Sequence, residues 1–360
     1  MKKISLLLLL TISTLCLQAQ CFDMGNLSAP GVTCTYGSYS NPYANVGIVN
    51  GRHTVMGGGY DDIIPQLKTV PEGEKNAIRL GNSGTGSQAE SITFEYTVDN
   101  ANPIVLLKYA AVMEDPGHVP SQQPRLRLEV LNSHNAAIDP ECTSFDFIAS
   151  PSLGWNGSSI LWKDWTNIGV DLSSYSGQTI RIRLTNYDCN QSGHFGYAYI
   201  HLSCAQKRIK SQACGSVDHV TFSAPAGFEY YWYDSNGNKC GNSQTITVPM
   251  DSKLYYCDIS QVGKPDCKYT TSIIAEPRFP IADFSIQQIR GCADTLYISN
   301  LSGVSKDGIN KNSPFEACDE ATWDLGDGRV LTEYDLKTTP ITYAHRGTYT
   351  ITMTVKLKDG

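Results

Sequence analysis

The sequence predicts an all-β chain arranged as tandem β-sandwiches. Apolar and polar residues alternate with a period of two along many short runs, as in residues 91–98, where Ile92, Phe94, Tyr96 and Val98 would share one face of a strand. These runs are separated by Gly, Asn, Asp, Ser and Pro, and helical periodicity is almost absent. Many short, turn-separated strands favour antiparallel sandwiches over a parallel α/β sheet.

The first twenty residues, MKKISLLLLLTISTLCLQAQ, have the pattern of a secretory signal peptide. A basic head precedes an apolar run over residues 4–17, which is short for a bilayer span. We expect residues 1–20 to be a leader cleaved after Ala19, and a protein that is secreted or held on the cell surface outside the outer membrane. Cys21 raises the alternative of a lipid anchor, against which Gln20 argues, because lipoprotein processing normally requires a small residue there. No later segment is apolar enough to cross a membrane.

Charge and cysteine content indicate which classes of partner are disfavoured and in which cellular compartment the protein resides. Without the two lysines of the leader, 26 of the 28 basic residues remain against 35 acidic ones, so the net charge is −9. An acidic chain without a dense Lys/Arg patch disfavours nucleic acid as a partner. Of the twelve cysteines, only Cys16 lies in the leader, and eleven cysteines in an exported protein predict disulfides. The odd number leaves a free thiol, an intermolecular bond, or a partner beyond residue 360.

Three blocks follow the leader. Residues 21–206 end in GYAYIHLSC and suit a jelly-roll sandwich of the galactose-binding or carbohydrate-binding kind. Residues 207–278 start with a short basic connector and hold about five strands of a small immunoglobulin-like sandwich. Residues 279–360 form the third block. In the first block, the strands at 125–131 and 179–185 turn leucine, isoleucine and valine inward and Arg127, Arg181 and Arg183 outward.

Disulfide partners cannot be deduced from sequence, so the following pairs are hypotheses. A bond within a block this small would stabilise it by about 2–4 kcal/mol. We expect the pairs Cys189–Cys204 in the first block, Cys214–Cys267 and Cys240–Cys257 in the second, and Cys292–Cys318 in the third.

The third block carries the motif Trp323-Asp-Leu-Gly-Asp-Gly328, followed by ITYAHRGTYTITMTV at residues 341–355. The two stretches resemble the polycystic kidney disease (PKD) domain, with Leu325 where that family usually has Phe. Asp324 and Asp327 can accept backbone N–H bonds in a tight bend, and we favour this role over a calcium site or an acid pair. PKD domains add a strand after the final Asp-Gly turn, so we expect a fragment of a longer polypeptide, truncated before its last strand.

No catalytic constellation stands out, and we expect a protein that is not an enzyme. Cys189 and His194 lie within YDCNQSGHFG at residues 187–196, but a disulfide explains the cysteine better than a thiol nucleophile. The seven histidines show no paired metal-ligand spacing. Glu114 and Asp115, and the adjacent acids at 61 and 62, are weak candidates for a structural calcium, and solvated loop acids are the favoured alternative. We expect no other cofactor.

Aromatic and arginine residues of the first block suggest ligand binding. Trp155 lies close to two further tryptophans at 162 and 165, whose rings could stack on sugars, although packing is expected for at least two of the three. Along residues 197–202, Tyr197, Tyr199 and His201 should point outward. If this strand neighbours the arginine-bearing strand at 179–185, an Arg-Tyr-His surface results, suited to sugar hydroxyls, uronic acids or carboxylate-bearing peptides. The alternative is an ordinary sheet face, partly covered by the next domain.

The stretches NPYANVGIVNGRHTV and SSILWKDWTNIGVDLSSYSGQTIRIRLTNYDCNQSGHFGYAYIHLSC resemble the N-terminal modules of large secreted proteins of Bacteroidetes. In that family, jelly-roll, immunoglobulin-like and PKD modules precede a gliding-motility-associated sorting domain that the type IX export machinery reads. The resemblance implies an adhesin-like protein that recognises a glycan or a host or matrix protein, with the sorting domain outside this sequence. Two alternatives remain: the accessory region of a secreted peptidase or glycosidase, and a purely structural stalk.

Overall fold

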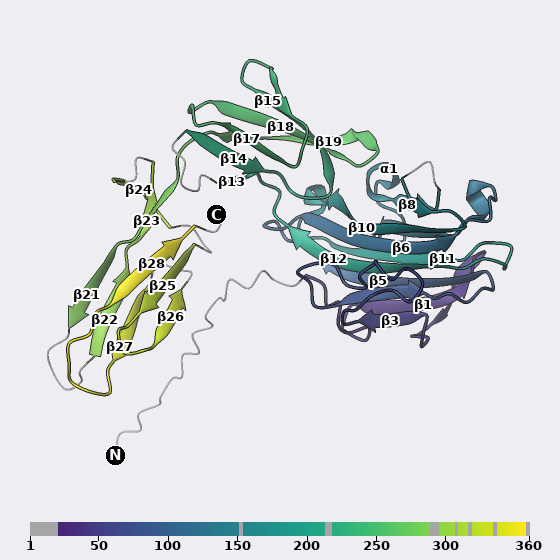
Figure 1. Ribbon diagram of the computed structural model, residues 1–360, viewed down its shortest axis with the longest axis horizontal. Coiled ribbons are helices and arrows are strands. Elements are labelled where there is room, and N and C mark those ends of the chain that lie inside the picture. The colour runs from purple at the N-terminus through teal and green to yellow at the C-terminus, as the bar shows by residue number, and fades with distance from the viewer. Residues whose placement is uncertain are drawn as a thin grey trace.

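The computed structural model describes residues 21–150, 154–212, 218–288, 295–306, 309–315, 319–333 and 337–357. Nearly all regular structure in these residues is β, distributed over seven antiparallel sheets (Figure 1). The predicted fold class, all-β in tandem sandwiches, is therefore confirmed. Within the described part of the chain, no helix has the length and apolar character needed to cross a bilayer.

The first sandwich consists of two six-stranded sheets. The first sheet has the order β2-β1-β5-β11-β7-β8, with β1 Val32–Ser38, β2 Asn41–Val46, β5 Gln88–Thr97, β7 Arg125–Leu131, β8 Phe145–Ile148 and β11 Thr179–Tyr187. The second has the order β3-β4-β12-β6-β10-β9, with β3 His53–Met56, β4 Ala77–Gly81, β6 Ile104–Glu114, β9 Asn156–Gly157, β10 Ile160–Asp171 and β12 Gly196–Ala205. The chain crosses repeatedly from one sheet to the other, as in jelly rolls. Within the described residues of this sandwich, three short helices lie in the connections: η1 Pro120–Gln122, α1 Pro140–Thr143 and η3 Ser173–Tyr175.

The core of this sandwich lies between the two sheets. On β5 and β11, Phe94 and Ile182 are paired and both point inward, and Leu107 and Ile200 from the second sheet belong to the same buried cluster. Each fully buried side chain of this size contributes about 1.5–3 kcal/mol relative to an exposed one. The period-two alternation seen in the sequence therefore marks the inward faces of β5, β7 and β11 correctly.

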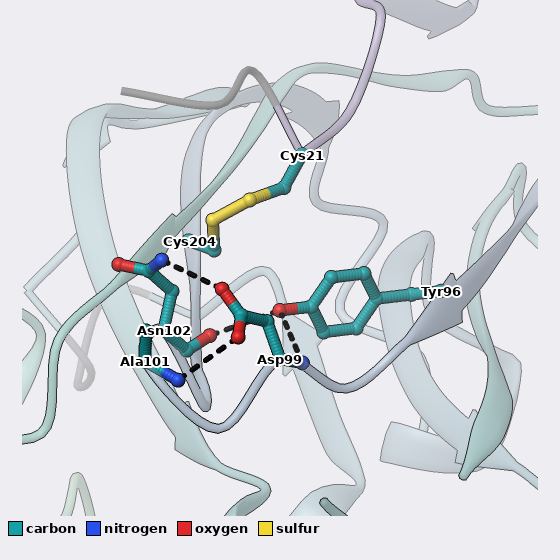
Figure 2. Close-up of a disulfide and its surroundings, with 6 residues drawn as sticks. All are labelled: Cys21, Tyr96, Asp99, Ala101, Asn102 and Cys204. Atoms are coloured by element: carbon teal, nitrogen blue, oxygen red, sulfur yellow. Dashed lines mark hydrogen bonds between the residues drawn. A yellow bond between two sulfur atoms is a disulfide. The ribbon is translucent and has the colours of Figure 1, made fainter. Parts of the chain in front are cut away.

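A disulfide joins Cys21 to Cys204 near the end of β12. Figure 2 shows it close to the turn after β5, where Asp99 accepts hydrogen bonds from Ala101 N and Asn102 Nδ2, each over 2.9 Å. The predicted Cys189–Cys204 pair is wrong, because Cys189 precedes the start of β12 and Cys204 lies at its end; a ten-residue strand spans roughly 30 Å. The bond also uses the sulfur of Cys21 that a lipid anchor would need.

The second sandwich packs a three-stranded sheet, β13-β14-β17, against a four-stranded one, β16-β15-β18-β19. Its strands are β13 Lys210–Gln212, β14 His219–Ser223, β15 Phe228–Asp234, β16 Lys239–Gly241, β17 Thr245–Pro249, β18 Leu254–Gln261 and β19 Lys264–Ile274. Trp232 and Phe222 fill the core, and the indole N–H of Trp232 donates to Ser243 O over 2.9 Å. The predicted Cys240–Cys257 disulfide is absent, because β15 separates the two cysteine-bearing strands and Cys240 faces solvent.

A second disulfide, Cys142–Cys267, links helix α1 of the first sandwich to β19 of the second. The predicted Cys214–Cys267 pair is therefore wrong, and Cys214 lies outside the described residues. Ile104 of β6 belongs to the core of the second sandwich, and Gly169 N donates to Gly227 O over 2.7 Å across the junction. The two sandwiches are thus held together by a covalent bond, a shared apolar core and backbone hydrogen bonding.

The remaining sheets belong to the third sandwich. Their orders are β20-β23-β24, β21-β22-β27 and β26-β25-β28, with β20 Phe279–Ile281, β21 Phe284–Gln288, β22 Thr295–Asn300, β23 Gly303–Ser305, β24 Lys311–Pro314, β25 Glu320–Asp324, β26 Val330–Glu333, β27 Thr338–Thr342 and β28 Thr352–Lys356. Trp323 is fully buried and donates from Nε1 to Glu333 Oε2 over 3.0 Å. Cys292 and Cys318, predicted as a pair, lie outside the described residues.

The two aspartates after β25 act as turn formers. Asp324 Oδ1 accepts a hydrogen bond from Gly326 N over 2.9 Å, and Asp327 Oδ1 accepts one from Arg329 N over 3.1 Å. Gly326 has φ +75°, and a Cβ there would meet Thr350 O at 2.5 Å, so this position requires glycine. The backbone-bonding role predicted for Asp324 and Asp327 is the one observed.

Candidate functional site

The structure divides the predicted ligand-binding residues between two faces. Tyr197, Tyr199 and His201 lie on β12 of the second sheet, with exposed fractions of only 3%, 1% and 6%. Strand β12 pairs with β4 and β6, whereas Arg181 and Arg183 lie on β11 of the first sheet. The expected Arg-Tyr-His surface is therefore not formed.

The segment between β3 and β4 covers the outer face of β12. Asp61, buried in this segment, accepts hydrogen bonds from the hydroxyls of Tyr197 over 2.8 Å and Tyr199 over 2.7 Å. Leu67 of the same segment packs into an apolar cluster with both tyrosines. Burial, followed by the negative charge of Asp61, raises the pKa of Tyr197 far above its usual value. These tyrosines form a second core, and an alternating sequence cannot show that a loop covers the outer face of its strand.

The tryptophans also serve packing. Trp155 is buried in the core of the first sandwich, so it offers no ring to a ligand at the surface. Trp162 and Trp165 are half-buried against the apolar cluster that contains Tyr197 and Tyr199, and Trp165 Nε1 donates a hydrogen bond to Lys68 O over 2.8 Å. The packing role expected for at least two of the three tryptophans is the one observed.

Arg127, Arg181 and Arg183 do come together, on the outer side of neighbouring strands β7 and β11. Each guanidinium is paired with a carboxylate of the same face: Arg183 with Glu129 over 2.9 Å, Arg127 with Asp146 over 3.0 Å, and Arg181 with Glu95 over 3.0 Å. We call this surface the arginine face. It comprises Tyr43, Glu95, Arg125, Arg127, Glu129, Asp146, Arg181, Arg183, Thr185 and Tyr187, of which Arg125, Thr185 and Tyr187 are themselves buried.

Tyrosines that the sequence interpretation missed complete the arginine face. The ring of Tyr43 lies over the guanidinium of Arg183, 4.1 Å from its carbon, and the Tyr43 hydroxyl is 3.3 Å from Glu129 Oε2. Tyr187 lies 5.3 Å from the ring of Tyr39 and 5.8 Å from the guanidinium carbon of Arg127. The signal in the sequence was the run TYGSYSNPY at residues 35–43, whose tyrosines surround the β1–β2 turn.

The arginine face carries more positive than negative charge, although the chain as a whole is acidic. Its four arginines face three carboxylates, against a net charge of −7 for the full sequence, and the fourth arginine is Arg125, whose side chain is only 8% exposed. The Arg183–Glu129 pair is well shielded, with side chains only 15% and 19% exposed. Burial by itself lowers the pKa of Arg127, and the charge and hydrogen bond of Asp146 overcome this, so the pKa lies above its usual value. The paired carboxylates therefore hold the arginines in fixed orientations.

The candidate calcium ligands are engaged with the protein itself. Glu114 Oε2 accepts Phe195 N over 3.1 Å, and Asp115 Oδ1 accepts Gln123 Nε2 over 2.6 Å. These bonds order the loops at the end of β6. Calcium at Glu114 and Asp115 stays a prediction.

No protein-family model matches the sequence, and no curated protein matches it significantly. Among solved structures, TmCBM61 in complex with beta-1,4-galactotriose is 8% identical with a TM-score of 0.30, covering 52% of this chain and 98% of that chain. The CBM22-1-CBM22-2 tandem domain of Paenibacillus barcinonensis Xyn10C is 9% identical with a TM-score of 0.20, covering 90% and 81%. A beta-1,2-glucanase from Parabacteroides distasonis is 10% identical with a TM-score of 0.25, covering 69% and 37%. Similarities at this level carry no argument about function, which must come from the site.

Proposed function

We propose that this chain is a non-catalytic recognition protein whose first sandwich binds acidic glycans on the arginine face. The observation that supports this most directly is the layered arrangement of Tyr43, Arg183 and Glu129, which presents ring, guanidinium and carboxylate in fixed orientations. Carboxylates and guanidinium groups hydrogen-bond sugar hydroxyls, and arginine binds uronate carboxylates in a bidentate manner. The excess of arginine over carboxylate favours an anionic sugar over a neutral one.

Export of the protein and the role of its second and third sandwiches are part of the same proposal. The leader pattern and the two disulfides support export to an oxidising compartment. The second sandwich and the PKD-like third sandwich would then act as spacers in an adhesin-like protein of the Bacteroidetes type, displayed through a sorting domain beyond residue 360. Binding of a host or matrix protein, a role as accessory region of a hydrolase, and a stalk without ligand are the alternatives that the experiment below has to exclude.

Calorimetric titration of the whole chain with oligogalacturonate, and with neutral galacto-oligosaccharide of equal length, tests the glycan specificity. We expect binding of the acidic oligosaccharide that weakens as salt is raised, because charge-assisted contacts at a surface are screened. Arg183→Ala and Tyr43→Ala should each reduce affinity about tenfold or more. Both variants should stay folded, as near-ultraviolet circular dichroism would show, although Arg183→Ala also leaves Glu129 of a shielded pair without its partner and should lower the unfolding temperature.

Arg329→Ala is the matched control. Arg329 is also paired with an aspartate, Asp327 over 2.7 Å, and lies 5.5 Å from the ring of Tyr343, but it belongs to the third sandwich. Its substitution should leave binding unchanged. Equal losses of affinity in Arg329→Ala and Arg183→Ala would show that the charge of the protein affects binding non-specifically. A wide array of acidic and neutral glycans without any signal would exclude glycan recognition, and a signal from matrix proteins alone would favour the protein-binding alternative.

A further inference from the structure

Three side chains with metal-binding atoms meet at one end of the first sandwich. His118 comes from the loop between β6 and β7, and Cys189 and His194 from the loop between β11 and β12. Their ligand atoms all lie within 4.8 Å of one another, and Cys189 Sγ is 3.4 Å from His194 Nδ1. The two imidazoles are 5.5 Å apart and close to perpendicular, at 78°. Residues separated by more than seventy positions in sequence are thus gathered into one Cys-His-His cluster.

The cysteine of this cluster is not needed for a disulfide. Cys189 is a buried free thiol, and Cys204, its expected partner, is bonded to Cys21 instead. Cysteine binds metals as the thiolate, and zinc accepts a cysteine sulfur together with imidazole nitrogens. Burial of a thiol beside two imidazoles is therefore a chemically appropriate arrangement for a borderline or soft cation.

His118 provides an independent observation. Its Nε2 atom is buried and, among the described residues, has no hydrogen-bond partner. Buried polar atoms are normally satisfied, and a bound cation would give this imidazole nitrogen, in a ring that adjoins a thiol and a second imidazole, its missing partner. If His118, which is half-buried, served packing alone, this nitrogen would keep no partner among the described residues.

The backbone around the cluster is fixed by hydrogen bonds before any ion binds. Cys189 N donates to His194 O over 3.0 Å, and Ser192 N donates to Cys189 O over 3.2 Å, which closes the second loop. Asn190 N donates to Gln122 O over 3.1 Å and ties this loop to the one that carries His118. The backbone that carries Cys189 and His194 is therefore ordered without an ion, and it is tied to the loop that carries His118.

We propose that His118, Cys189 and His194 bind one Zn²⁺ ion and that this ion braces the two loops at the end of the sandwich. Zinc prefers sulfur and nitrogen ligands in a tetrahedron, with Zn–S near 2.3 Å and Zn–N near 2.0–2.1 Å. Such a tetrahedron separates its ligand atoms by roughly 3.3–3.6 Å. The 3.4 Å between Cys189 Sγ and His194 Nδ1 matches this separation, and the ligand atom of His118, within 4.8 Å of both, has to come closer when the ion binds. Three protein ligands leave the fourth position to water or to an external ligand. Calcium and magnesium, which require oxygen ligands, do not fit this cluster.

Cobalt substitution of the whole chain tests the site. The purified protein is freed of metal with a chelator and titrated with Co²⁺ and then with Zn²⁺. We expect one equivalent of Co²⁺ to bind, with a thiolate-to-cobalt charge-transfer band and the intense visible bands of a tetrahedral ion, and Zn²⁺ to displace it. Cys189→Ser should remove the charge-transfer band, and His118→Gln should weaken Zn²⁺ binding by about tenfold or more.

Cys240→Ser and His134→Gln are the matched controls, because they change an exposed free thiol and an exposed histidine away from the cluster. Both should bind cobalt with the wild-type spectrum. If Cys189→Ser fails to fold, as near-ultraviolet circular dichroism would reveal, His118→Gln still decides the question from its loop. No binding at micromolar Co²⁺ or Zn²⁺, or a bound spectrum that survives both cluster substitutions, would overturn the proposal. A cluster that takes copper and rejects zinc would overturn the assignment to zinc.

Discussion

Cys142 in helix α1 and Cys267 in β19 form a disulfide whose Cα atoms are 5.4 Å apart, and this bond joins two different sandwiches. Beside it, Lys264 donates from Nζ to Ser144 O over 2.7 Å and lies 4.7 Å from the ring of Phe145. The second sandwich is therefore cross-linked to the first rather than stapled within itself, which fixes how the first sandwich is carried.

Removing this cross-link should loosen the second sandwich selectively. In Cys142→Ala/Cys267→Ala, we expect the second sandwich to lose about 2–4 kcal/mol, since a disulfide acts mainly by restricting the unfolded chain. Scanning calorimetry should show an earlier transition for the second sandwich while the first keeps its own. Cys240→Ala, at an exposed free thiol, is the control and should change nothing. An unaltered calorimetric trace for the double variant would contradict this role of the bond.

Close packing of Gly169 against Phe228 should make the junction sensitive to a single methyl group. A Cβ at Gly169 would lie 2.2 Å from Phe228 Cε2, so Gly169→Ala should displace the ring and weaken the junction by about 1–3 kcal/mol. Small-angle scattering should then report a broader distribution of orientations between the sandwiches. Adding Phe228→Leu should restore part of the loss, and Gly57→Ala, where a Cβ meets nothing within 4 Å, is the control. If Phe228→Leu did not restore any of the lost stability, the effect of Gly169→Ala would have a cause other than contact with the Phe228 ring.

Asp61 should be essential to the covered face of β12. Asp61→Ala leaves the hydroxyls of Tyr197 and Tyr199 buried without an acceptor, and each unsatisfied group costs about 1–3 kcal/mol. Urea unfolding should show the corresponding drop in the free energy of unfolding. Asp62→Ala is the neighbouring control, because Asp62 is exposed and should cost almost nothing. A similar decrease in the free energy of unfolding in both variants would mean that the tyrosine hydroxyls form hydrogen bonds with water in place of Asp61.

The sequence predicted strands and inward faces well, because half-buried sheets impose a period of two on the chain. The pattern identified the inward side chains of β5, β7 and β11 and the outward position of Arg183. It failed at Tyr197 and Tyr199, because coverage by the β3–β4 segment is a tertiary property with no local signature. The same alternation marks both an exposed and a covered outer face.

Contacts between distant segments account for the other errors. Cys189 and Cys204 are close in sequence, yet strand β12 lies between them. His118 and His194 are far apart in sequence, and two loops at one end of the sandwich bring them together, so a search for local ligand spacing could not find the cluster. Tyr43 on the edge strand β2 contacts Arg183 on β11, although β1 and β5 lie between the two strands in the sheet, and no local pattern predicts such a contact.

The buried imidazole of His53 should make stability depend on pH. Its Nδ1 accepts Val49 N over 3.2 Å, so the proton resides on Nε2, which lies 3.1 Å from Thr35 O and 3.2 Å from Ser91 O. Burial lowers the pKa of His53, the carbonyl bonds partly oppose this, and the positive charge of Arg52 adds to the lowering.

The folded protein therefore binds a proton at His53 less readily than the unfolded chain does, and the unfolded histidine titrates near pH 6.5. The stability is complete above that pH and declines as the pH falls through it, by at most about 1.4 kcal/mol per pH unit, until the folded pKa is reached. Urea unfolding between pH 5 and pH 8, in the presence of a chelator, should show this decline in the wild type. His53→Gln, which keeps a donor and an acceptor without a titrating group, should show a shallower slope. Parallel slopes in the two proteins would locate the dependence in other groups.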